Sequence, residues 1–527
     1  MGNVKNRLKR CRLIMKILLA GPGTGKTAKI QNFIDQFRGG SQCLVLSFTN
    51  ATINDLLKTL SSKGITEANC MTLHKFAVKF NHDISRHILL PEEIHILEQV
   101  GNQISVEFSD LCNQLHATTF DQMIDRFVAF AKSNNLYLKE KLNDFEYLII
   151  DEYQDFNNHE QSLIDLLFPY FKDVIILGDD DQCVYDFKDA SNKKIISLFN
   201  DINNEKIDHE HKCFRCPDEV VEYATNLIIN NKLRINKKWL KSGKNGNLLY
   251  GQVQDLAGVA DYIVRNIKSI QSRDMNASIF ILSPVGFISD PIKEKLSLEG
   301  LDFEDCNAPK IDSELLEKAW GVRALFGNHK YLNLVFLGYK KSNPRKTLYE
   351  MIKLHLNIGL NYDELFGKLS SKFSTDILTG YSSLSEILSQ DSYGEIKALY
   401  DKTEGRTEEE RLERIFMKKE DTDLIKKIRV MSIHKSKGLD AEYVFIVGLT
   451  EGILPNKKDG IDSLESQRRV LYVGMTRAKK CLCLISVLKI PGKFANKVNK
   501  EDFHFDYKQK LWNGKASRFI DELKLKV

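Results

Sequence analysis

The segment 20–27 constrains the fold of this chain more than any other stretch. It follows the short apolar run 17–19, and a polar stretch of helical pattern begins at Lys26. Where a strand leads through a glycine-rich turn into a helix, backbone N–H groups can turn toward an anion, and the N-terminal end of the helix adds positive potential. The pattern is that of a phosphate-binding P-loop, with Ala20 where the first glycine often stands. An ordinary glycine-rich turn before a helix is the alternative.

The P-loop prediction assigns roles to individual residues. Lys26 can reach the terminal phosphates of a nucleotide, and the Thr27 hydroxyl can bind Mg²⁺. The remaining residues form the phosphate-binding turn: Gly21, Pro22, Gly23, Thr24 and Gly25.

Length and composition are typical of a globular protein with several domains. A chain of 527 residues is long enough for about three or four domains. The sequence has no apolar run near the ~20 residues of a membrane span, and its basic start lacks the apolar segment of a signal peptide. The ten cysteines are scattered through apolar segments, which is typical of reduced thiols. We therefore expect a cytoplasmic protein with no membrane partner.

Positive charge is clustered in two short segments. The net charge is only +5, but residues 1–16 and residues 230–246 each carry six Lys or Arg and no acid. Such segments are usually solvated faces, and they also resemble surfaces that contact phosphates.

Polar and aromatic residues follow the predicted strands of the first half. The run 43–50 is predicted to be a buried strand that ends in Phe48, Thr49 and Asn50, and Thr72 and His74 follow further on. Ligands bind at such strand ends in open α/β sheets. Phe48 can therefore stack on a base or pack in the core.

Two further strand ends carry candidate catalytic groups. The apolar strand before Asp151 and Glu152 delivers a carboxylate pair, in which Asp151 can hold Mg²⁺ through water and Glu152 can orient or deprotonate an attacking water. Two solvated acids are the alternative.

After the strand 174–177, Gln182 can contact a γ-phosphate, and Tyr185 and Phe187 can stack on bases. Phe187 can instead pack in the core under its loop.

The segment 209–216 allows two interpretations. On a strand, His209, His211 and Cys213 would share one face, and with Cys216 they could bind zinc. The second interpretation comes from the order of all the motifs.

Taken together, the motifs resemble those of the UvrD/Rep/PcrA-type helicases of superfamily 1. The P-loop resembles motif I, and the later motifs occur in the family's order: 46–50 (Ia), 72–74 (Ib), 151–155 (II), 178–190 (III), 213–216 (IV), 432–440 (V) and 465–478 (VI). The match of 213–216 to motif IV favours the helicase interpretation over zinc.

The resemblance implies a fold and a set of roles. It implies an α/β fold with two RecA-like P-loop NTPase domains, ATP and Mg²⁺ between them, and single-stranded DNA across both. Lys26, Glu152 and Gln182 would be catalytic, with Thr27 and Asp151 at the metal. Arg215 and Arg477 would be arginine fingers, which stabilise the charge of phosphoryl transfer. Phe214 would stack on adenine, and Asp440 would lie near the ribose. The DNA-binding residues would be Phe48, Thr49, Asn50, Thr72, His74, Tyr185, Phe187, Lys188, Ser432 and His434.

Three features depart from the family pattern. The segment whose glutamine contacts adenine is not found before Met15, so we expect weak discrimination between ATP and GTP. Lys188 and Asp189 replace an Arg-Gly pair, and Lys lacks the planar fork of Arg. Both insertions between the sheet segments are shorter than in large members of the family.

The sequence thus predicts the following organisation. A basic extension covers 1–14, the first RecA-like domain 15–77 and 145–200, and the second 201–302 and 425–527, with helical insertions at 78–144 and 303–424. The predicted function is an ATP-dependent 3′→5′ translocase and helicase acting on single-stranded and tailed duplex DNA. The alternatives are an ATP-gated DNA-sensing module with a protein partner in a repair or defence complex, and action on RNA, because base stacking barely distinguishes the two sugars.

Overall fold

The structure is a computed structural model that describes residues 15–37, 40–61, 64–66, 69–81, 86–104, 106–308, 320, 332–333, 336, 426–456 and 460–525. The predicted extension 1–14 and nearly all of the predicted insertion 303–424 lie outside the described residues. The chain divides into two compact units, the first formed by 1–79, 130–307 and 426–527 and the second by 80–129 and 308–425. The first unit contains two six-stranded sheets.

The first sheet contains the P-loop strand. Its strands are all parallel and lie in the order β3-β2-β6-β7-β1-β8. They are β1 (Met15–Leu19), β2 (Cys43–Ser47), β3 (Cys70–Thr72), β6 (Tyr147–Ile150), β7 (Asp173–Gly178) and β8 (Glu205–Lys206). The central strands are runs of Leu, Val and Ile that are buried on both faces, as parallel strands covered by helices are. The continuous apolar runs therefore predicted these strands correctly.

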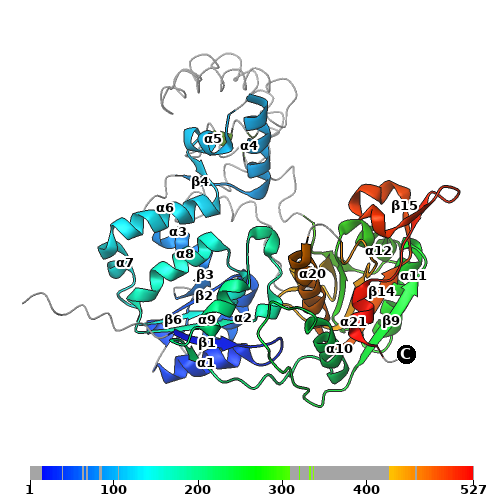
Figure 1. Cartoon of the computed structure of the whole chain (residues 1–527), viewed down its shortest axis with the longest axis horizontal. Coiled ribbons are helices and arrows are strands. Elements are labelled where there is room, and N and C mark those ends of the chain that lie inside the picture. Colours follow the sequence, from blue (N-terminus) through cyan, green and yellow to red (C-terminus); the bar gives the residue numbers. More distant parts are fainter. Residues whose placement is uncertain are drawn as a thin grey trace, which may run out of the picture. The chain divides into compact units, whose positions relative to one another are not determined.

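Helices lie against this first sheet, and we call the sheet with its helices the first lobe (Figure 1). They are α1 (Lys26–Gln36), α2 (Asn50–Leu60), α3 (Leu73–Phe80), α7 (Asn135–Lys141), α8 (Asn158–Leu167) and α9 (Lys193–Asn200). Ile30 and Ile34 of α1 pack with Leu56 of α2 and with Leu18 and Val45 of the sheet in one buried cluster. This packing fixes the helix starts that follow β1 and β2 at one edge of the sheet.

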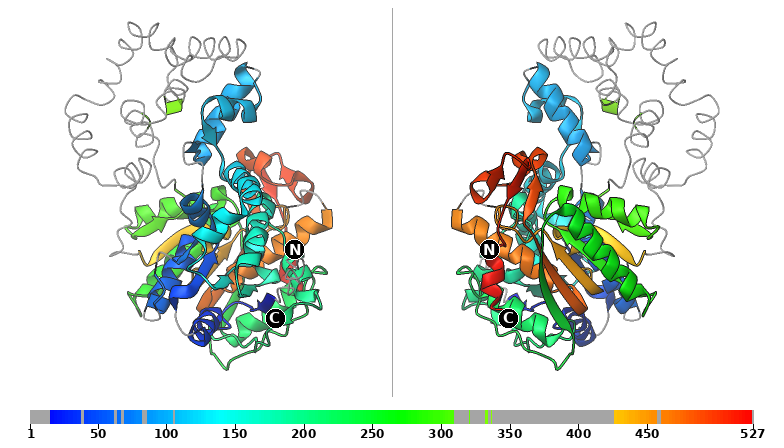
Figure 2. Two further views of the ribbon diagram at one scale, coloured as in Figure 1. Left: turned by 90° about the vertical axis from the view of Figure 1, so that its left-hand side faces the viewer. Right: turned by 90° about the vertical axis from the view of Figure 1, so that its right-hand side faces the viewer.

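The second sheet has the same parallel architecture and no P-loop. Its order is β11-β12-β10-β13-β14-β9. The strands are β9 (Asn247–Val253), β10 (Ile279–Ser283), β11 (Phe303–Asp305), β12 (Ile428–Ser432), β13 (Ala441–Val447) and β14 (Ala478–Val487). Strands β9 and β14, far apart in the sequence, lie side by side (Figure 2). The two parallel sheets confirm the predicted α/β class with RecA-like domains.

Helices cover both faces of the second sheet, and together they form the second lobe. They are α10 (Asp218–Ile228), α11 (Leu256–Gln271), α12 (Gly286–Leu298), α20 (Gly460–Met475) and α21 (Arg518–Leu523). Neighbouring residues of a strand point to opposite faces. Leu282 therefore packs with the cluster that contains α10, α20 and α21 residues, whereas Ile281 packs with α11 and α12 residues.

Some elements were not expected from the sequence. An antiparallel sheet follows β14, with β15 (Lys489–Pro491), β16 (His504–Asp506) and β17 (Leu511–Asn513) in the order β15-β17-β16. In the predicted helical insertion 78–144, the structure has α4 (Pro91–Ile104), α5 (Phe108–Gln114) and α6 (Phe120–Ser133), and also a short parallel pair, β4 (His87–Ile88) and β5 (Ala117–Thr118). Strands of two or three residues are too short for a periodic signal.

Within the described ranges, no helix has both the length and the apolar character that crossing a membrane requires.

Candidate active site

The P-loop connects β1 to α1 at the edge of the first sheet. Gly23 and Gly25 have φ of +71° and +87°, the left-handed region that favours glycine. A Cβ on Gly25 would point into open space, whereas one on Gly23 would lie 2.6 Å from Cβ of Arg215. The Thr24 hydroxyl donates to the Gly21 carbonyl at 2.8 Å and closes the turn. A glycine-rich turn that leads into the N-terminus of a helix is a suitable binding site for an anion such as phosphate.

Lys26 lies against the two carboxylates that end β6. Its Nζ is hydrogen-bonded to Glu152 Oε1 and lies 3.6 Å from Asp151 Oδ1. Burial alone would lower the pKa of Lys26, but the carboxylates outweigh it and the pKa is raised. Burial also acts to raise the pKa of both acids. For Asp151 burial is the larger effect, and the pKa is raised to about 6. For Glu152 the positive charges of Lys26 and Lys437 are the larger effect, and the pKa is lowered to about 2. Glu152 is therefore a carboxylate at neutral pH.

The same corner suits a hard cation. Asp151 Oδ1 is buried and makes no hydrogen bond with any described residue. Thr27 lines the same cavity as Asp151. A carboxylate and a hydroxyl are oxygen ligands of the kind that Mg²⁺ takes beside phosphates. The donor set therefore fits the predicted Mg²⁺ site.

Gln182 lies between the two lobes at the end of η5 (Asp180–Gln182). Its Oε1 accepts from Arg477 Nη2 of the second lobe at 3.2 Å, and its Nε2 donates to Asp179 Oδ2 at 2.8 Å. Arg477 is only 2% exposed. Burial lowers the pKa of its guanidinium to about 10, so it is still a cation at neutral pH.

Arg215, Phe214 and Asp440 lie around the outer part of the P-loop. The Phe214 N–H donates to the Gly23 carbonyl at 2.8 Å, and the ring of Phe214 is 62% exposed. Arg215 Nε lies 3.4 Å from Asp440 Oδ2. The exposed ring is free to stack on a flat ligand beside the P-loop.

These groups line one cavity of about 410 Å³. Its walls come from both lobes and carry six basic side chains and four acidic ones. The basic residues are Lys26, Arg215, Lys244, Lys437, Arg477 and Lys479, and the acidic residues are Asp55, Asp151, Glu152 and Asp440. The excess of cations around a P-loop suits a polyanionic ligand such as a nucleoside triphosphate.

The sequence did not single out every residue of this cavity. Lys437 Nζ lies 2.6 Å from Asp155 Oδ2 and donates to the Gln182 carbonyl, so it joins the second lobe to two motifs of the first. Lys244 and Lys479 also line the cavity. Lys437 lies in the predicted motif V, which was a usable signal, whereas Lys244 and Lys479 lie outside the residues to which a role was assigned.

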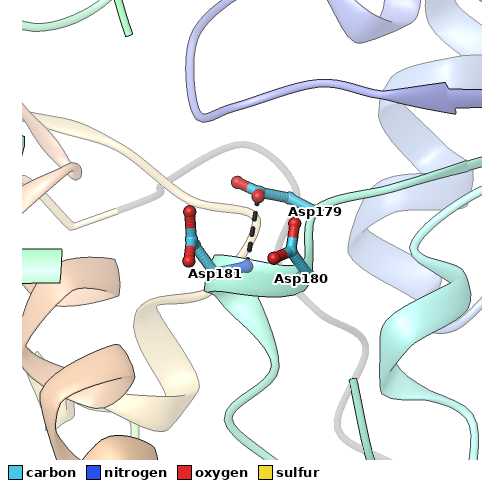
Figure 3. A group of neighbouring side chains, drawn as sticks. All are labelled: Asp179, Asp180 and Asp181. Atoms are coloured by element: carbon cyan, nitrogen blue, oxygen red, sulfur yellow. Dashed lines mark hydrogen bonds between the residues drawn. The ribbon is translucent and has the colours of Figure 1, made fainter. Parts of the chain in front are cut away.

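The predicted zinc alternative is not supported. His209 Nε2 lies 2.9 Å from the Thr24 hydroxyl, and the Cys216 N–H donates to Cys213 Sγ at 3.3 Å. Across the described ranges, the carboxylates of Asp179, Asp180 and Asp181 form the one group with metal-ligand spacing (Figure 3). The segment 209–216 instead contacts the P-loop, as its motif IV interpretation requires.

Four predicted DNA-binding residues form a row of rings across the two lobes. Ring centroids are 5.0 Å apart for Phe48 and Tyr185, 6.0 Å for Tyr185 and Phe187, and 5.4 Å for Phe187 and His434. Phe187 is 67% exposed, so the alternative that it packs in the core is wrong. Lys188 is also exposed, with Nζ 5.9 Å from the centroid of Tyr185. Such a row is a suitable stacking surface for bases.

The other predicted DNA-binding residues have varied surroundings. Thr72 is buried, and its hydroxyl accepts from the Lys75 N–H at 3.2 Å, which caps the start of α3. Thr49 likewise caps α2 by accepting from the Thr52 N–H at 3.2 Å. The hydroxyls of these two threonines therefore have a helix-capping role that the sequence analysis did not predict.

Three more residues of this set lie near strand ends. His74 Nε2 is 2.9 Å from Glu160 Oε1, and Asn50 is exposed at the start of α2. Ser432 ends β12, where its N–H donates to Asn307 Oδ1 at 3.0 Å.

Comparison with protein families matches two regions of the chain. Residues 9–188 match an AAA domain, and residues 390–489 match the UvrD-like helicase C-terminal domain. The first region includes the P-loop, Asp151 and Gln182, and the second includes His434 and Arg477. The two matches thus contain groups from both walls of the cavity.

Comparison with curated proteins finds several similar helicases. A probable DNA helicase II homolog of Mycoplasma capricolum subsp. capricolum is 26% identical over 459 residues, which cover 73% of this chain and 63% of that protein. The ATP-dependent DNA helicase Rep of Buchnera aphidicola subsp. Acyrthosiphon pisum is 26% identical over 534 residues, 86% of this chain and 82% of that protein. The ATP-dependent DNA helicase PcrA of Leuconostoc citreum is 24% identical over 429 residues, which cover 69% of this chain and 57% of that protein. The chain thus spans less than two thirds of the length of the first and third proteins.

Proposed function

Because the chain belongs to the UvrD/Rep/PcrA-like superfamily 1 of ATP-hydrolysing DNA helicases, we propose that it uses ATP to move 3′ to 5′ along single-stranded DNA and to separate tailed duplexes. One observation carries the proposal. Lys26, Glu152 and Gln182 of the first lobe meet Arg215 and Arg477 of the second in a single cavity. Hydrolysis then depends on both lobes, as a motor requires.

The arrangement supports the following chemistry. The P-loop N–H groups and Lys26 bind the phosphates of ATP. The γ-phosphate competes with Glu152 for Lys26, which frees the Glu152 carboxylate to orient the attacking water. Thr27 and Asp151 would hold Mg²⁺, which would offset the phosphate charge. Arg215 and Arg477 stabilise the charge that develops on the transferred group, an effect of about 10³ to 10⁵ for an arginine finger.

The DNA-facing side of the proposal depends on the loop after β7. Gln182 and Phe187 belong to this one loop, and they lie at the cavity and in the row of rings respectively. A shift of Gln182 on phosphate binding or release would therefore also move a ring that holds a base. A stacked base contributes ~1–3 kcal/mol, enough to bias a step along the strand by about ten- to a hundred-fold.

ATPase assays with and without single-stranded DNA test the chemistry. Lys26→Ala should lose DNA-stimulated hydrolysis and bind nucleotide more weakly. Glu152→Gln should lose hydrolysis but retain binding, because a water-orienting group acts mainly in the transition state. Glu205→Gln, on the exposed strand β8, is the matched control and should turn over normally. Normal turnover by Glu152→Gln would remove this glutamate from the reaction.

Strand-displacement assays test polarity and substrate. Duplexes with a 3′ tail should be unwound in preference to duplexes with a 5′ tail. DNA-stimulated hydrolysis without any displacement would favour the DNA-sensing alternative instead. Equal stimulation by RNA would contradict DNA as the preferred substrate.

A further inference from the structure

The segment 230–241, which we call the bridging segment, connects the second lobe to the P-loop. It follows α10, and near its start Asn231 Nδ2 donates to the Glu465 carbonyl of α20 at 3.0 Å. Near its end, Trp239 Nε1 donates to the Pro22 carbonyl of the P-loop at 3.2 Å. This segment belongs to the basic region 230–246. Two of its cations, Arg234 and Lys237, have specific buried partners.

Those partners are three consecutive aspartates at the end of β7. Asp179, Asp180 and Asp181 are at most 1% exposed, and their ligand oxygens lie within 4.8 Å of one another (Figure 3). Lys237 Nζ lies 2.8 Å from Asp179 Oδ1 and 2.8 Å from Asp181 Oδ2, and it also contacts Asp180. The ammonium group thus touches all three carboxylates and takes the position that they offer to a cation.

Arg234 makes a separate contact with this group of acids. Its Nε and Nη2 donate to the two oxygens of Asp181 at 3.0 and 2.8 Å, a bidentate pair. Arg234 therefore pairs with Asp181, whereas Lys237 is the cation that contacts Asp179 in the described part of the chain. Burial alone would lower the pKa of Lys237, but the three aspartates outweigh it and raise the pKa, so Lys237 stays charged.

Asp179 connects this ionic group to the catalytic residues. Its Oδ2 accepts from Gln182 Nε2 at 2.8 Å, which leaves Gln182 Oε1 directed at Arg477. Its backbone N–H donates to Gln154 Oε1 at 2.9 Å, and Gln154 Nε2 donates to Glu152 Oε2 at 2.6 Å. The orientation of the Gln182 amide therefore depends on the position of the Asp179 carboxylate oxygen that accepts from it.

We infer that Lys237 is a positioning residue, which holds the Asp179 carboxylate in place so that the Gln182 amide faces Arg477 and the γ-phosphate. The inference rests on the proposed role of Gln182. Removing one partner of a buried ion pair leaves the other charge uncompensated, so the surroundings of that charge rearrange. Asp179 then no longer holds the Gln182 amide in one orientation. A misplacement of a catalytic group by about 1 Å can lower the rate by about a hundred-fold.

The test compares Lys237→Met with Arg234→Met, which removes an equally specific ion pair from the same segment but leaves Asp179 paired. Lys237→Met should lower kcat for DNA-stimulated ATP hydrolysis by about ten- to a hundred-fold, with KM for ATP within about threefold of wild type. Lys237→Arg, which restores a cation, should recover part of kcat. Arg234→Met should lower Tm but keep kcat within about threefold of wild type. Equal losses of kcat in Lys237→Met and Arg234→Met would show a structural effect only and overturn the inference.

A double-mutant cycle distinguishes this inference from the proposed function. If Lys237 acts through Gln182, adding Lys237→Met to Gln182→Ala should change kcat by less than about twofold. If instead the double variant loses kcat by the product of the two single losses, Lys237 and Gln182 act independently and the positioning role is overturned. If Gln182→Ala alone turns over normally, the proposed role of Gln182 fails. If Gln182→Ala is slow and Lys237→Met is normal, only the inference about Lys237 fails.

A charge-balanced variant covers the case in which Lys237→Met does not fold. Lys237→Met combined with Asp180→Asn removes one positive and one negative charge and keeps an oxygen that can accept from the Ile235 N–H. Asp179 still lacks its cation in this variant, so the kcat deficit should persist in folded protein. Wild-type kcat in this variant would contradict the inference.

Discussion

At the scale of single residues, exposure separates two phenylalanines that lie in the same aromatic region. Phe187 is 67% exposed, whereas Phe156 is fully buried with its ring centroid 5.6 Å from that of Phe48. Exposed rings beside a DNA-facing loop contribute to binding, and buried rings contribute to the core. Similar substitutions at these two positions should therefore have opposite consequences.

Phe187→Ala should leave the free energy of unfolding within about 0.5 kcal/mol of wild type, because the ring is exposed. Basal ATPase should be retained, single-stranded DNA should bind ~1–3 kcal/mol more weakly, and fewer base pairs should be unwound per ATP. Denaturant titration and DNA-binding titration measure the two effects. Phe156→Ala, as the control, should lose about 3–5 kcal/mol of stability. Unchanged DNA affinity and coupling in a folded Phe187→Ala protein would exclude the stacking role.

At the scale of elements, parallel strands were predictable and their supporting contacts were not. The expected strands 43–50 and 174–177 overlap β2 and β7, because each is a run of apolar residues that helices bury. The site residues were recognisable because they follow such strands. The Lys237, Gln154 and Arg469 contacts were not, since their partners come from other elements: Arg469 Nε, for example, donates to the Cys183 carbonyl at 2.9 Å.

Thr72 provides a test at the scale of one helix. Because its hydroxyl caps α3, Thr72→Ala should cost about 1 kcal/mol of stability, and Thr72→Ser, which keeps the hydroxyl, should cost less. Thermal or denaturant unfolding measures the difference. Affinity for single-stranded DNA should be the same for both variants. Weaker DNA binding by Thr72→Ala at unchanged stability would instead support a direct contact.

At the scale of the whole molecule, the nucleotide cavity exists only where the two lobes meet. Its candidate base-binding side contains the exposed ring of Phe214, and stacking on a ring does not distinguish one purine from another. Strong selection between bases needs buried polar groups that the wrong base leaves unpaired. The segment that contacts adenine in the family is not recognisable before Met15, and residues 1–14 lie outside the described structure.

We therefore expect ATP and GTP to differ by less than about a hundred-fold in kcat/KM, because stacking on Phe214 leaves no polar group unpaired when guanine replaces adenine. Steady-state hydrolysis of both nucleotides at saturating single-stranded DNA measures the ratio. Phe214→Ala should weaken both nucleotides alike. A preference for ATP of 10⁴ or more, typical of hydrogen-bonded recognition, would mean that another segment contacts the base.

The contact between Trp239 and the P-loop also gives the protein an optical signal. The protein has three tryptophans, and Trp239 is the one beside the P-loop: its Cδ1 lies 3.4 Å from the position that a Cβ on Gly21 would occupy. Trp512 lies in β17, and Trp320 lies in the second unit. Indole emission responds to a change in the polarity and charge around the ring, so arrival of the phosphates should change the fluorescence of Trp239. Titration of the Glu152→Gln protein with ATP should show this change without turnover, and Trp239→Phe should abolish it while Trp512→Phe should not. Stopped-flow mixing would then report, in the unlabelled protein, how fast the P-loop fills and empties during ATP turnover.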